Sequence, residues 1–210
     1  MNNNKNINNR YIVVSGNIGS GKSTLVKLLS SYLPHFHTFY EPFEANPYLD
    51  AFYKNKKRWG FNSQIYFLSQ HAKQHYNINK ENYVIQDSCI DDSVNIFGMN
   101  LYNNGFMSKR DWKTYYDLYN ILKSNLKLPD LVFYLKASEN TIIERIKSRN
   151  RMIESNMDVN YIKDLNNLYN AWMLERNKSV KTIVIDVDSI DLIDNKNYVN
   201  LIIDEINLNI

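Results

Sequence analysis

Short apolar runs alternate with helical patterns along the 210 residues of the chain. Most of these runs are apolar along their whole length, which is typical of parallel strands that are covered on both faces. We expect strands at Tyr11–Ser15, His37–Glu41, Tyr83–Asp87, Leu131–Lys136 and Thr182–Val187. Because helical segments separate them, the pattern indicates βαβ units and therefore an α/β fold, with a five-stranded parallel sheet flanked by helices.

Apolar residues at helix spacing fill the segments between the predicted strands. One stripe runs from Leu25 to Leu33 and ends at Pro34, and Ser138 is a candidate N-cap for a second helix. Longer helical patterns cover residues 61–79, 89–103, 109–126, 158–177 and 195–208. No linker or internal repeat interrupts the chain, so we expect one domain over residues 10–210, after a disordered polar tail at residues 1–9.

Composition and charge narrow the classes of function. With 25 Lys and Arg against 22 Asp and Glu, and no basic block, the chain gives no reason to expect a nucleic acid polymer as partner. No apolar run approaches the roughly 20 residues of a membrane helix, and the start has no signal-peptide character, so we expect a soluble cytoplasmic protein. Cys89 is the one cysteine, which excludes an internal disulfide; we expect it to be a small buried side chain rather than a nucleophile.

A glycine-rich turn follows the first predicted strand. Its sequence, GNIGSGKST, fits the phosphate-binding pattern G-x-x-x-x-G-K-[ST]. Glycines let several N–H groups point into one concavity, and the following helix adds the positive end of its dipole. We expect Lys22 to contact the β- and γ-phosphates of ATP and Ser23 to ligate Mg²⁺. The expected nucleotide site is Gly16, Asn17, Ile18, Gly19, Ser20, Gly21, Lys22, Ser23 and Thr24.

This loop does not identify the phosphate acceptor, because GTPases, ATPases and small-molecule kinases share it. The chain has no guanine signature of the N-K-x-D type. Glu41 ends the second predicted strand, at the edge where open α/β sheets bind ligands, and a carboxylate there can accept the proton of an attacking hydroxyl. A solvated strand end explains the same residue, so its role is open at this point.

A longer stretch bears on the acceptor. The segment EPFEANPYLDAFYKNKKRWGFNSQIYFLSQ, residues 41–70, resembles the segment after the second strand of deoxynucleoside kinases. The resemblance continues through VIQDSCIDDSVNIFGMNL, IIERIKSRNRMIES and YIKDLNNLYNAWM, and covers nearly the whole chain from Arg10 onward. It implies a P-loop kinase fold with an arginine-bearing lid, a homodimer, and a nucleotide-salvage enzyme that phosphorylates the 5′-hydroxyl of a deoxynucleoside with ATP and Mg²⁺.

The resemblance also implies roles for single residues at the acceptor. Glu41 matches the general base that takes the proton of the 5′-hydroxyl. Tyr53 and Glu154 match the pair that hydrogen-bonds the sugar 3′-hydroxyl. Gln64 matches the amide that reads the base, which suits an amide because it offers both donors and an acceptor. Phe97, like Trp59, matches an apolar position near the nucleoside, although core packing explains both equally well.

Charged residues match the family at the phosphate side. Asp87 resembles the acidic residue that helps to hold Mg²⁺, and it is also a candidate N-cap. Arg145, Arg149 and Arg151 lie in what resembles the lid, where guanidinium groups can neutralise charge on the transferring phosphoryl group. The alternative for these arginines is a solvated basic helix end.

Four positions depart from the family pattern. Ser88 stands where an arginine usually contacts the reacting oxygen and phosphate, and loss of this cation would cost roughly 10²-fold in rate. His71 and Ser93, which we expect at the substrate, replace an Arg–Asp pair, and Ser63 replaces an aromatic, which predicts weaker stacking on the base. These departures leave open a retuned kinase, a catalytically impaired nucleotide-binding module, and a nucleoside monophosphate kinase with the same loop and lid.

Overall fold

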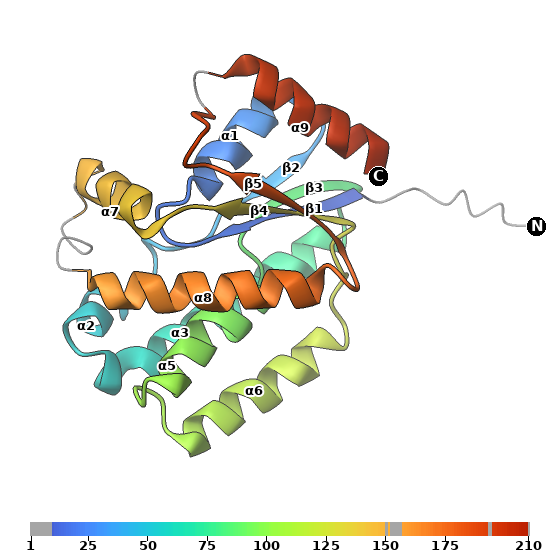
Figure 1. The fold of residues 1–210 in the computed structure, drawn as a ribbon. Coiled ribbons are helices and arrows are strands. Elements are labelled where there is room, and N and C mark those ends of the chain that lie inside the picture. Colours follow the sequence, from blue (N-terminus) through green and yellow to red (C-terminus); the bar gives the residue numbers. More distant parts are fainter. Residues whose placement is uncertain (1–9, 150, 152–156, 193–194, 210) are drawn as a thin grey trace, which may run out of the picture.

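Five strands in the described part of the chain form one sheet in which every pairing is parallel (Figure 1). The structure, a computed structural model, describes residues 10–149, 151, 157–192 and 195–209. The strands follow the order β2-β3-β1-β4-β5, which confirms the expected α/β sheet. Their bounds are β1 (Arg10–Gly16), β2 (His37–Phe39), β3 (Tyr83–Asp87), β4 (Leu131–Lys136) and β5 (Lys181–Asp186).

The central strand β1 explains why the runs are apolar throughout. It pairs with β3 on one side and β4 on the other, so that Ile12 lies opposite both Ile85 and Leu131. Alternate residues point to opposite faces of a strand, and both faces of β1 are covered: Ile12 and Val13 are fully buried in two different apolar clusters. The prediction for β2 was too long, because pairing ends at Phe39 and leaves Glu41 beyond the strand.

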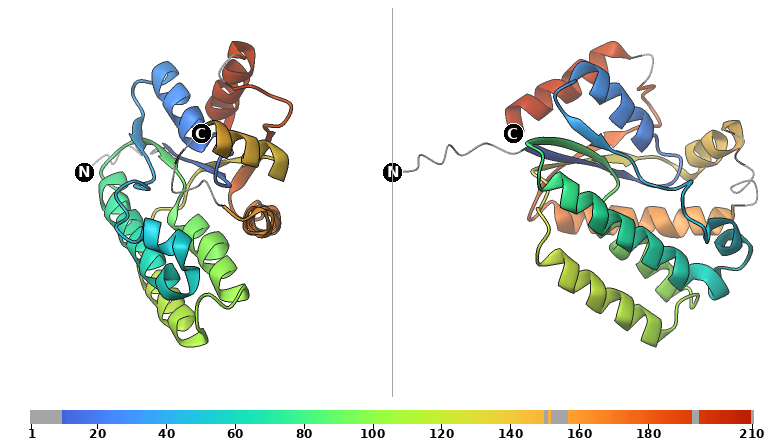
Figure 2. Two further views of the ribbon diagram at one scale, coloured as in Figure 1. Left: turned by 90° about the vertical axis from the view of Figure 1, so that its left-hand side faces the viewer. Right: turned by 180° about the vertical axis from the view of Figure 1, so that it is seen from behind.

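Helices cover both faces of the sheet, as Figures 1 and 2 show. α1 (Lys22–Tyr32) and α9 (Lys196–Asn209) lie on one face, where Leu25 and Ile202 pack in one cluster with Ile12.

The opposite face carries a thicker layer of helices. α3 (Lys56–Ile78) and α8 (Val159–Arg176) lie against it, and Tyr169 packs in one cluster with Val13. α6 (Lys109–Lys123) forms the outer side of this layer (Figure 2).

Several short elements in this layer differ from the predicted helices. α2 (Leu49–Lys54) has no counterpart in the sequence prediction, because six residues are too few to display a helical period. The single helix expected over 89–103 consists of α4 (Ile90–Asp92), a π-helical segment η1 (Ser93–Gly98) and α5 (Met99–Asn103). π-helical turns are frequent at functional sites, and η1 carries residues of the site described below.

Side-chain caps fix where the helices begin. The Oδ1 of Asn55 accepts the N–H of Arg58 at 3.0 Å, so α3 begins five residues before the predicted start. α7 (Glu139–Ser148) begins after Ser138, whose Oγ accepts an N–H of the first turn, and this confirms the predicted cap. α7 lies beyond the carboxyl ends of the strands (Figure 1).

A buried ionic cluster joins α8 to the start of α4. Arg176 is 4% exposed, and its Nη atoms lie 3.5 Å from Asp91 Oδ2 and 3.8 Å from Asp92 Oδ1. The same guanidinium donates to Cys89 Sγ at 3.5 Å. Cys89 is buried, as predicted, and burial raises the pKa of its thiol to about 12, which favours the neutral form.

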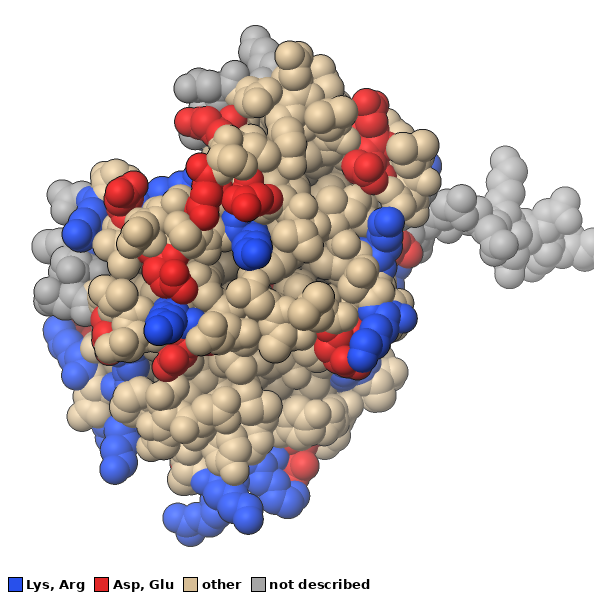
Figure 3. All heavy atoms as spheres, in the orientation of Figure 1, with Lys and Arg blue, Asp and Glu red and all other residues tan. Residues whose placement is uncertain are grey.

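The outer surface carries charges of both signs. On the face that Figure 3 shows, acidic and basic side chains are interspersed among neutral ones. Within the described ranges, the helices lack the combination of length and apolar character that a membrane crossing requires.

The Arg176 cluster gives a stability prediction. Arg176→Met removes the buried cation that pairs with both Asp91 and Asp92, which should lower the free energy of unfolding by about 3–5 kcal/mol. Urea denaturation measures this loss. Lys178→Met is the matched control, because Lys178 lies two residues away in an exposed pair with Glu175 and should change stability little. Equal losses for the two variants would contradict the account.

Candidate active site

The glycine-rich turn connects β1 to α1 in a conformation that needs its glycines. A Cβ on Gly16 would lie only 2.8 Å from the carbonyl oxygen of Leu135, so no larger residue fits. Gly21 has φ +103° and is the N-cap of α1, which directs the first N–H groups of the helix into the turn. The Nζ of Lys22 donates to Asn17 O at 3.2 Å, so the lysine folds back over the turn.

Asn17 holds the turn against α8. Its Nδ2 donates to Ile162 O at 3.0 Å and to Asn166 Oδ1 at 2.7 Å, and its Oδ1 accepts the N–H of Ile18 at 2.7 Å. The Asn166 amide donates in turn to Ala137 O, beyond the end of β4. The Asn17 side chain therefore holds the turn in place, and its expected contact with the nucleotide stays a prediction.

An open cavity of about 1160 Å³ lies over the turn and is called the phosphate cavity here. It holds six of the nine predicted loop residues, but not Gly16, Asn17 or Ile18. The described residues that line it are Gly19, Ser20, Gly21, Lys22, Ser23, Thr24, Arg145, Ser148, Arg149, Arg151, Asp191 and Leu192. N–H groups at the start of α1, one lysine and three arginines make it suited to a polyphosphate.

The three arginines of the phosphate cavity are held differently. Arg145 donates to Ser20 O and to Val187 O, both at 3.0 Å, so its guanidinium braces the turn against the end of β5. Arg151 lies over the ring of Phe43 and 3.6 Å from the carboxylate of Glu44. It therefore connects the phosphate cavity to the segment that follows Glu41.

One oxygen pair in this region suits a divalent cation. Ser23 Oγ donates to Asp87 Oδ2, and Asp87 is 2% exposed with its Oδ1 lacking a partner in the described structure. A hydroxyl beside a buried carboxylate fits Mg²⁺, which takes one or two protein oxygens and completes its shell with water and substrate phosphates. The described residues contain no cluster of three or more His, Cys, Asp or Glu side chains that could hold a metal by themselves.

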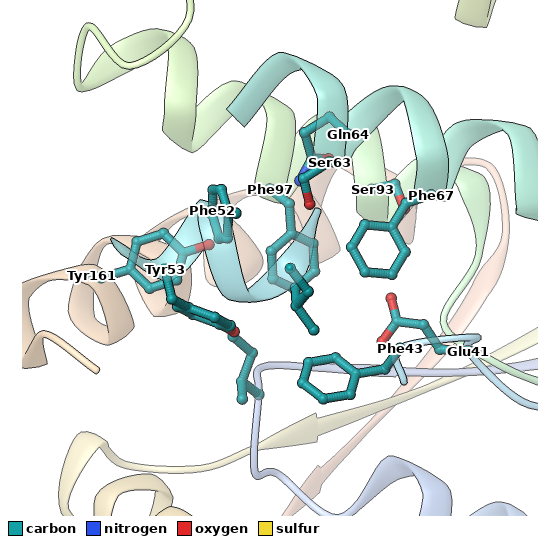
Figure 4. Close-up of a pocket in the computed structure, with 12 residues that line it drawn as sticks. Glu41, Phe43, Phe52, Tyr53, Ser63, Gln64, Phe67, Ser93, Phe97 and Tyr161 are labelled. Carbon is teal, nitrogen blue, oxygen red and sulfur yellow. The ribbon is translucent and has the colours of Figure 1, made fainter. Parts of the chain in front are cut away.

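A second cavity, the acceptor cavity, has an empty volume of about 440 Å³ (Figure 4), and Ile18 of the turn is among the residues that line it. It brings together five residues that were predicted at the substrate: Glu41, Tyr53, Gln64, Ser93 and Phe97. The remaining described residues that line it are Ile18, Phe43, Leu49, Phe52, Ser63, Phe67 and Tyr161. In Figure 4, Ser63 and Gln64 face the cavity from α3, and the carboxylate of Glu41 points in from the opposite wall.

Aromatic side chains flank the acceptor cavity more completely than the sequence suggested. Phe67 lies one helical turn after Ser63, on the same face of α3, and lines the cavity together with Phe97 and Phe43. Phe67 therefore brings an aromatic ring to the wall that also carries Ser63, and the expectation of weaker stacking on the base stays a prediction. Trp59 does not line the cavity and stacks on Tyr48 instead.

Two expected substrate residues are not among the described residues that line the acceptor cavity. His71 lies a turn beyond Phe67, fully buried and away from the lining of the cavity, next to His75 and Asp91. Burial and the neighbouring His75 lower the pKa of His71 to about 3, so the ring is neutral at physiological pH. Glu154 lies outside the described residues.

Glu41 has the electrostatic character of a base. Its removal from water raises the pKa of the carboxyl to about 7; the positive charge of Lys22 opposes this shift, and the carboxylates of Asp87 and Asp92 reinforce it. Asp92 is itself fully buried and accepts a hydrogen bond from Ser15 Oγ at 2.7 Å. A carboxylate with a pKa near neutrality is suited to proton transfer at physiological pH.

A directed chain of hydrogen bonds holds the peptide before Glu41. Gln74 Nε2 donates to Tyr40 O at 2.7 Å, and because a carbonyl can only accept, this bond fixes the orientation of the Gln74 amide. Gln74 Oε1 then accepts from Gln86 Nε2 at 2.8 Å, and Gln86 Oε1 accepts from the hydroxyl of Tyr11. The chain of hydrogen bonds runs from Tyr11, which is fully buried near the start of β1, to the segment beyond β2, where sheet pairing has ended.

Ser88 occupies a strained position between β3 and α4. Its φ of 59° lies in the left-handed region that serine rarely adopts, and its N–H donates to Val14 O at 3.0 Å. The side chain is 1% exposed, and Oγ has no hydrogen-bond partner in the described structure. Within the described lining of the acceptor cavity there is no Lys or Arg, so no cation there replaces the expected arginine.

Fold and site together define a phosphotransferase of the P-loop class, with a polyphosphate cavity and an apolar acceptor cavity on either side of one turn. The chain matches the sequence profile of the deoxynucleoside kinase family over residues 12–210. It therefore belongs to the deoxynucleoside kinase family.

Individual relatives agree with this assignment. The chain is 33% identical to a deoxyadenosine/deoxycytidine kinase of Bacillus subtilis, over 94% of this chain and 92% of the relative. It is 34% identical to a deoxyadenosine kinase of Dictyostelium discoideum, over 87% and 74%. The structure of deoxyadenosine kinase from M. mycoides with bound dATP superposes with a TM-score of 0.83 at 32% identity, covering 94% of this chain and 99% of that one.

The hydrogen-bond chain to Tyr40 gives a prediction for turnover. Gln74→Glu replaces the amide donor with a carboxylate that repels the Tyr40 carbonyl, so Glu41 should lose its fixed position. We expect kcat to fall roughly 10- to 100-fold while KM for the nucleoside changes much less.

Steady-state kinetics of Gln74→Glu are compared with those of a control variant on the same helix. Gln70→Glu makes the same chemical change one turn earlier, outside the hydrogen-bond chain. If both variants lower kcat equally, the effect is one of added charge and the positioning account is wrong.

Proposed function

We propose that the chain transfers the γ-phosphate of ATP to the 5′-hydroxyl of a deoxynucleoside and releases the deoxynucleoside monophosphate. The observation that carries this proposal is that consecutive residues of the turn line different cavities. Ile18 lines the acceptor cavity, and the next residue, Gly19, lines the phosphate cavity. A nucleoside and a polyphosphate bound in the two cavities would meet across one peptide of the turn.

In this proposal Glu41 is the general base. Its carboxylate points into the acceptor cavity, and a pKa of about 7 leaves it largely able to accept a proton at physiological pH. Tyr53 and Tyr161 lie at one end of the cavity, where their hydroxyls would contact the sugar, and Gln64 lies on the α3 wall, where its amide would contact the base. Phe67 and Phe97 would pack on the faces of the base.

Mg²⁺ and the cations of the phosphate cavity would stabilise the transferring group. Ser23 and Asp87 are the residues that would hold the metal, which when bound neutralises charge on the β- and γ-phosphates. Lys22, Arg149 and Arg151 would contribute further positive charge. Arg145 would act mainly by bracing the turn, because both of its recorded bonds are to backbone carbonyls.

The cellular setting is part of the proposal. We infer a cytoplasmic enzyme of nucleotide salvage, a single domain over residues 10–210, and the homodimer that the family resemblance implies. A monophosphate acceptor is less well supported, because its own phosphate would need a cation that the described lining of the acceptor cavity does not offer.

The experiment that tests the proposal compares the wild type with Glu41→Gln, using ATP, Mg²⁺ and each deoxynucleoside. The wild type should form a monophosphate. Glu41→Gln should lower kcat roughly 10²- to 10⁴-fold, because the amide cannot take the proton, while nucleoside binding changes little.

The pH profile of the wild type gives an independent readout. Glu41 acts only when deprotonated, so kcat/KM should fall about tenfold per pH unit below pH 7, where the carboxyl becomes protonated. A profile that stays flat down to pH 5, or a Glu41→Gln variant that keeps its rate, would exclude Glu41 as the base.

Ser88 favours a second candidate, a nucleotide-binding module on the same fold with impaired catalysis. Ser88→Arg should raise kcat by about tenfold or more if a cation is missing at this position. Ser88→Met adds similar bulk without charge and should not raise it. A wild type with robust turnover that Ser88→Arg leaves unchanged would rule out impairment at this position.

A further inference from the structure

We propose that Ser63 reads the base of the substrate, as a hydrogen-bond donor whose direction is set by Asn46. This inference rests on the proposed function, since it assumes that the acceptor cavity holds a nucleoside. It concerns the position where the family resemblance predicts an aromatic side chain, so it identifies a polar contact that the resemblance does not supply.

The orientation of Asn46 follows from its neighbours. Asn46 Oδ1 accepts the backbone N–H of Tyr48 at 3.0 Å. A backbone N–H can only donate, so this bond fixes which end of the amide is oxygen. Asn46 Nδ2 is therefore the group 3.0 Å from Ser63 Oγ, and it donates to the serine.

This bond leaves the hydroxyl hydrogen of Ser63 without an acceptor in the described structure. Serine in a helix often donates to a carbonyl one turn back, as Ser69 does to Tyr66 O, but no such bond occurs at Ser63. Ser63 and Asn46 are 1% and 6% exposed, so bulk water does not readily satisfy the donor. A buried donor without a partner is unfavourable, and a ligand acceptor in the cavity would remove that cost.

The hydroxyl lies where a ligand can meet it. Ser63 lines the acceptor cavity beside Gln64, and Figure 4 shows the two side chains next to each other on the α3 wall. Tyr115, fully buried, donates to Gln64 Oε1 across 3.4 Å, which supports an orientation with Gln64 Nε2 toward the cavity. The wall then offers two neighbouring donors to the base.

This arrangement selects a class of substrate. A deoxynucleoside is favoured when its base presents a carbonyl oxygen or ring nitrogen to Ser63, next to the atom that Gln64 contacts. A base that presents a C–H or an N–H at that position leaves the serine unsatisfied or in conflict, and sites of this kind discriminate strongly against such analogues. His71, expected near the substrate, takes no part, because it lies behind the cavity wall.

The test measures Kd by calorimetry and KM by turnover for the four natural deoxynucleosides. Ser63→Ala should weaken binding of the preferred deoxynucleoside about tenfold, with a smaller change in kcat. Ser63→Thr keeps a hydroxyl and should lose much less. Ser69→Ala is the matched control on the same helix, since Ser69 is exposed and does not line the cavity.

Asn46→Asp separates hydrogen-bond direction from shape. An aspartate accepts from both the Tyr48 N–H and the Ser63 hydroxyl, so it turns the serine donor away from the cavity while Ser63 stays in place. We expect the same loss of affinity as in Ser63→Ala, with thermal melts confirming that each variant is folded. If Asn46→Asp and Ser63→Ala both leave all four Kd values unchanged, the inference is wrong.

An analogue of the preferred base completes the test. An analogue that lacks the acceptor should bind the wild type more weakly, and Ser63→Ala should abolish that difference. Binding is measured without catalysis, so base selectivity that depends on Ser63 supports the inference even if no phosphate is transferred. If the protein forms a deoxynucleoside monophosphate but Ser63→Ala has the same Kd values as the wild type, the inference is wrong and the proposed function stands.

Discussion

The side chain of Asn17 is the contact on which the rest of the site depends. Asn17 lies in the turn that connects β1 to α1. Its side chain donates to Ile162 O and Asn166 Oδ1 and accepts the N–H of Ile18, so it holds this turn against α8. The turn separates two cavities of different chemistry, one cationic and open, the other mainly apolar. If the turn moved, the shapes of both cavities would change together. The three hydrogen bonds of the Asn17 side chain therefore fix the geometry of the phosphate cavity and of the acceptor cavity at the same time.

Charge balance sets the chemistry at this boundary. Glu41, Asp87 and Asp92 lie near one another at the carboxyl edge of the sheet, and Lys22 is the cation that most offsets them at Glu41. Their mutual repulsion, together with burial, keeps the pKa of Glu41 near neutrality. Serine at position 88, where an arginine was expected, adds no positive charge to offset these carboxylates, which favours a pKa of Glu41 near neutrality. Stabilisation of the transferring phosphoryl group would then depend more on a bound metal and on the arginines of the phosphate cavity.

The sequence predicted what periodicity and spacing determine, and missed what depends on packing. The parallel sheet followed from strand patterns and the loop at Gly16–Thr24 from its motif, whereas the places of Glu41, Tyr53, Gln64 and Phe97 at the acceptor followed from the resemblance to deoxynucleoside kinases. Phe67 and Tyr161 were missed, because apolar residues on helices are read as core unless the cavity is known. His71 was expected at the substrate from the family resemblance; two helical turns separate it from Gln64 by about 10 Å along α3, and it is not among the described residues that line the cavity.

The most direct test of the central claim follows the phosphate itself. The wild-type protein is incubated with Mg²⁺, ATP labelled in its γ-phosphate and a mixture of the deoxynucleosides, and the labelled products are separated. If the turn joins a donor cavity to a nucleoside acceptor, the label appears in a deoxynucleoside monophosphate. If the label stays in ATP or appears only as inorganic phosphate, while ATP binding is measurable, the two cavities do not act together as a kinase site.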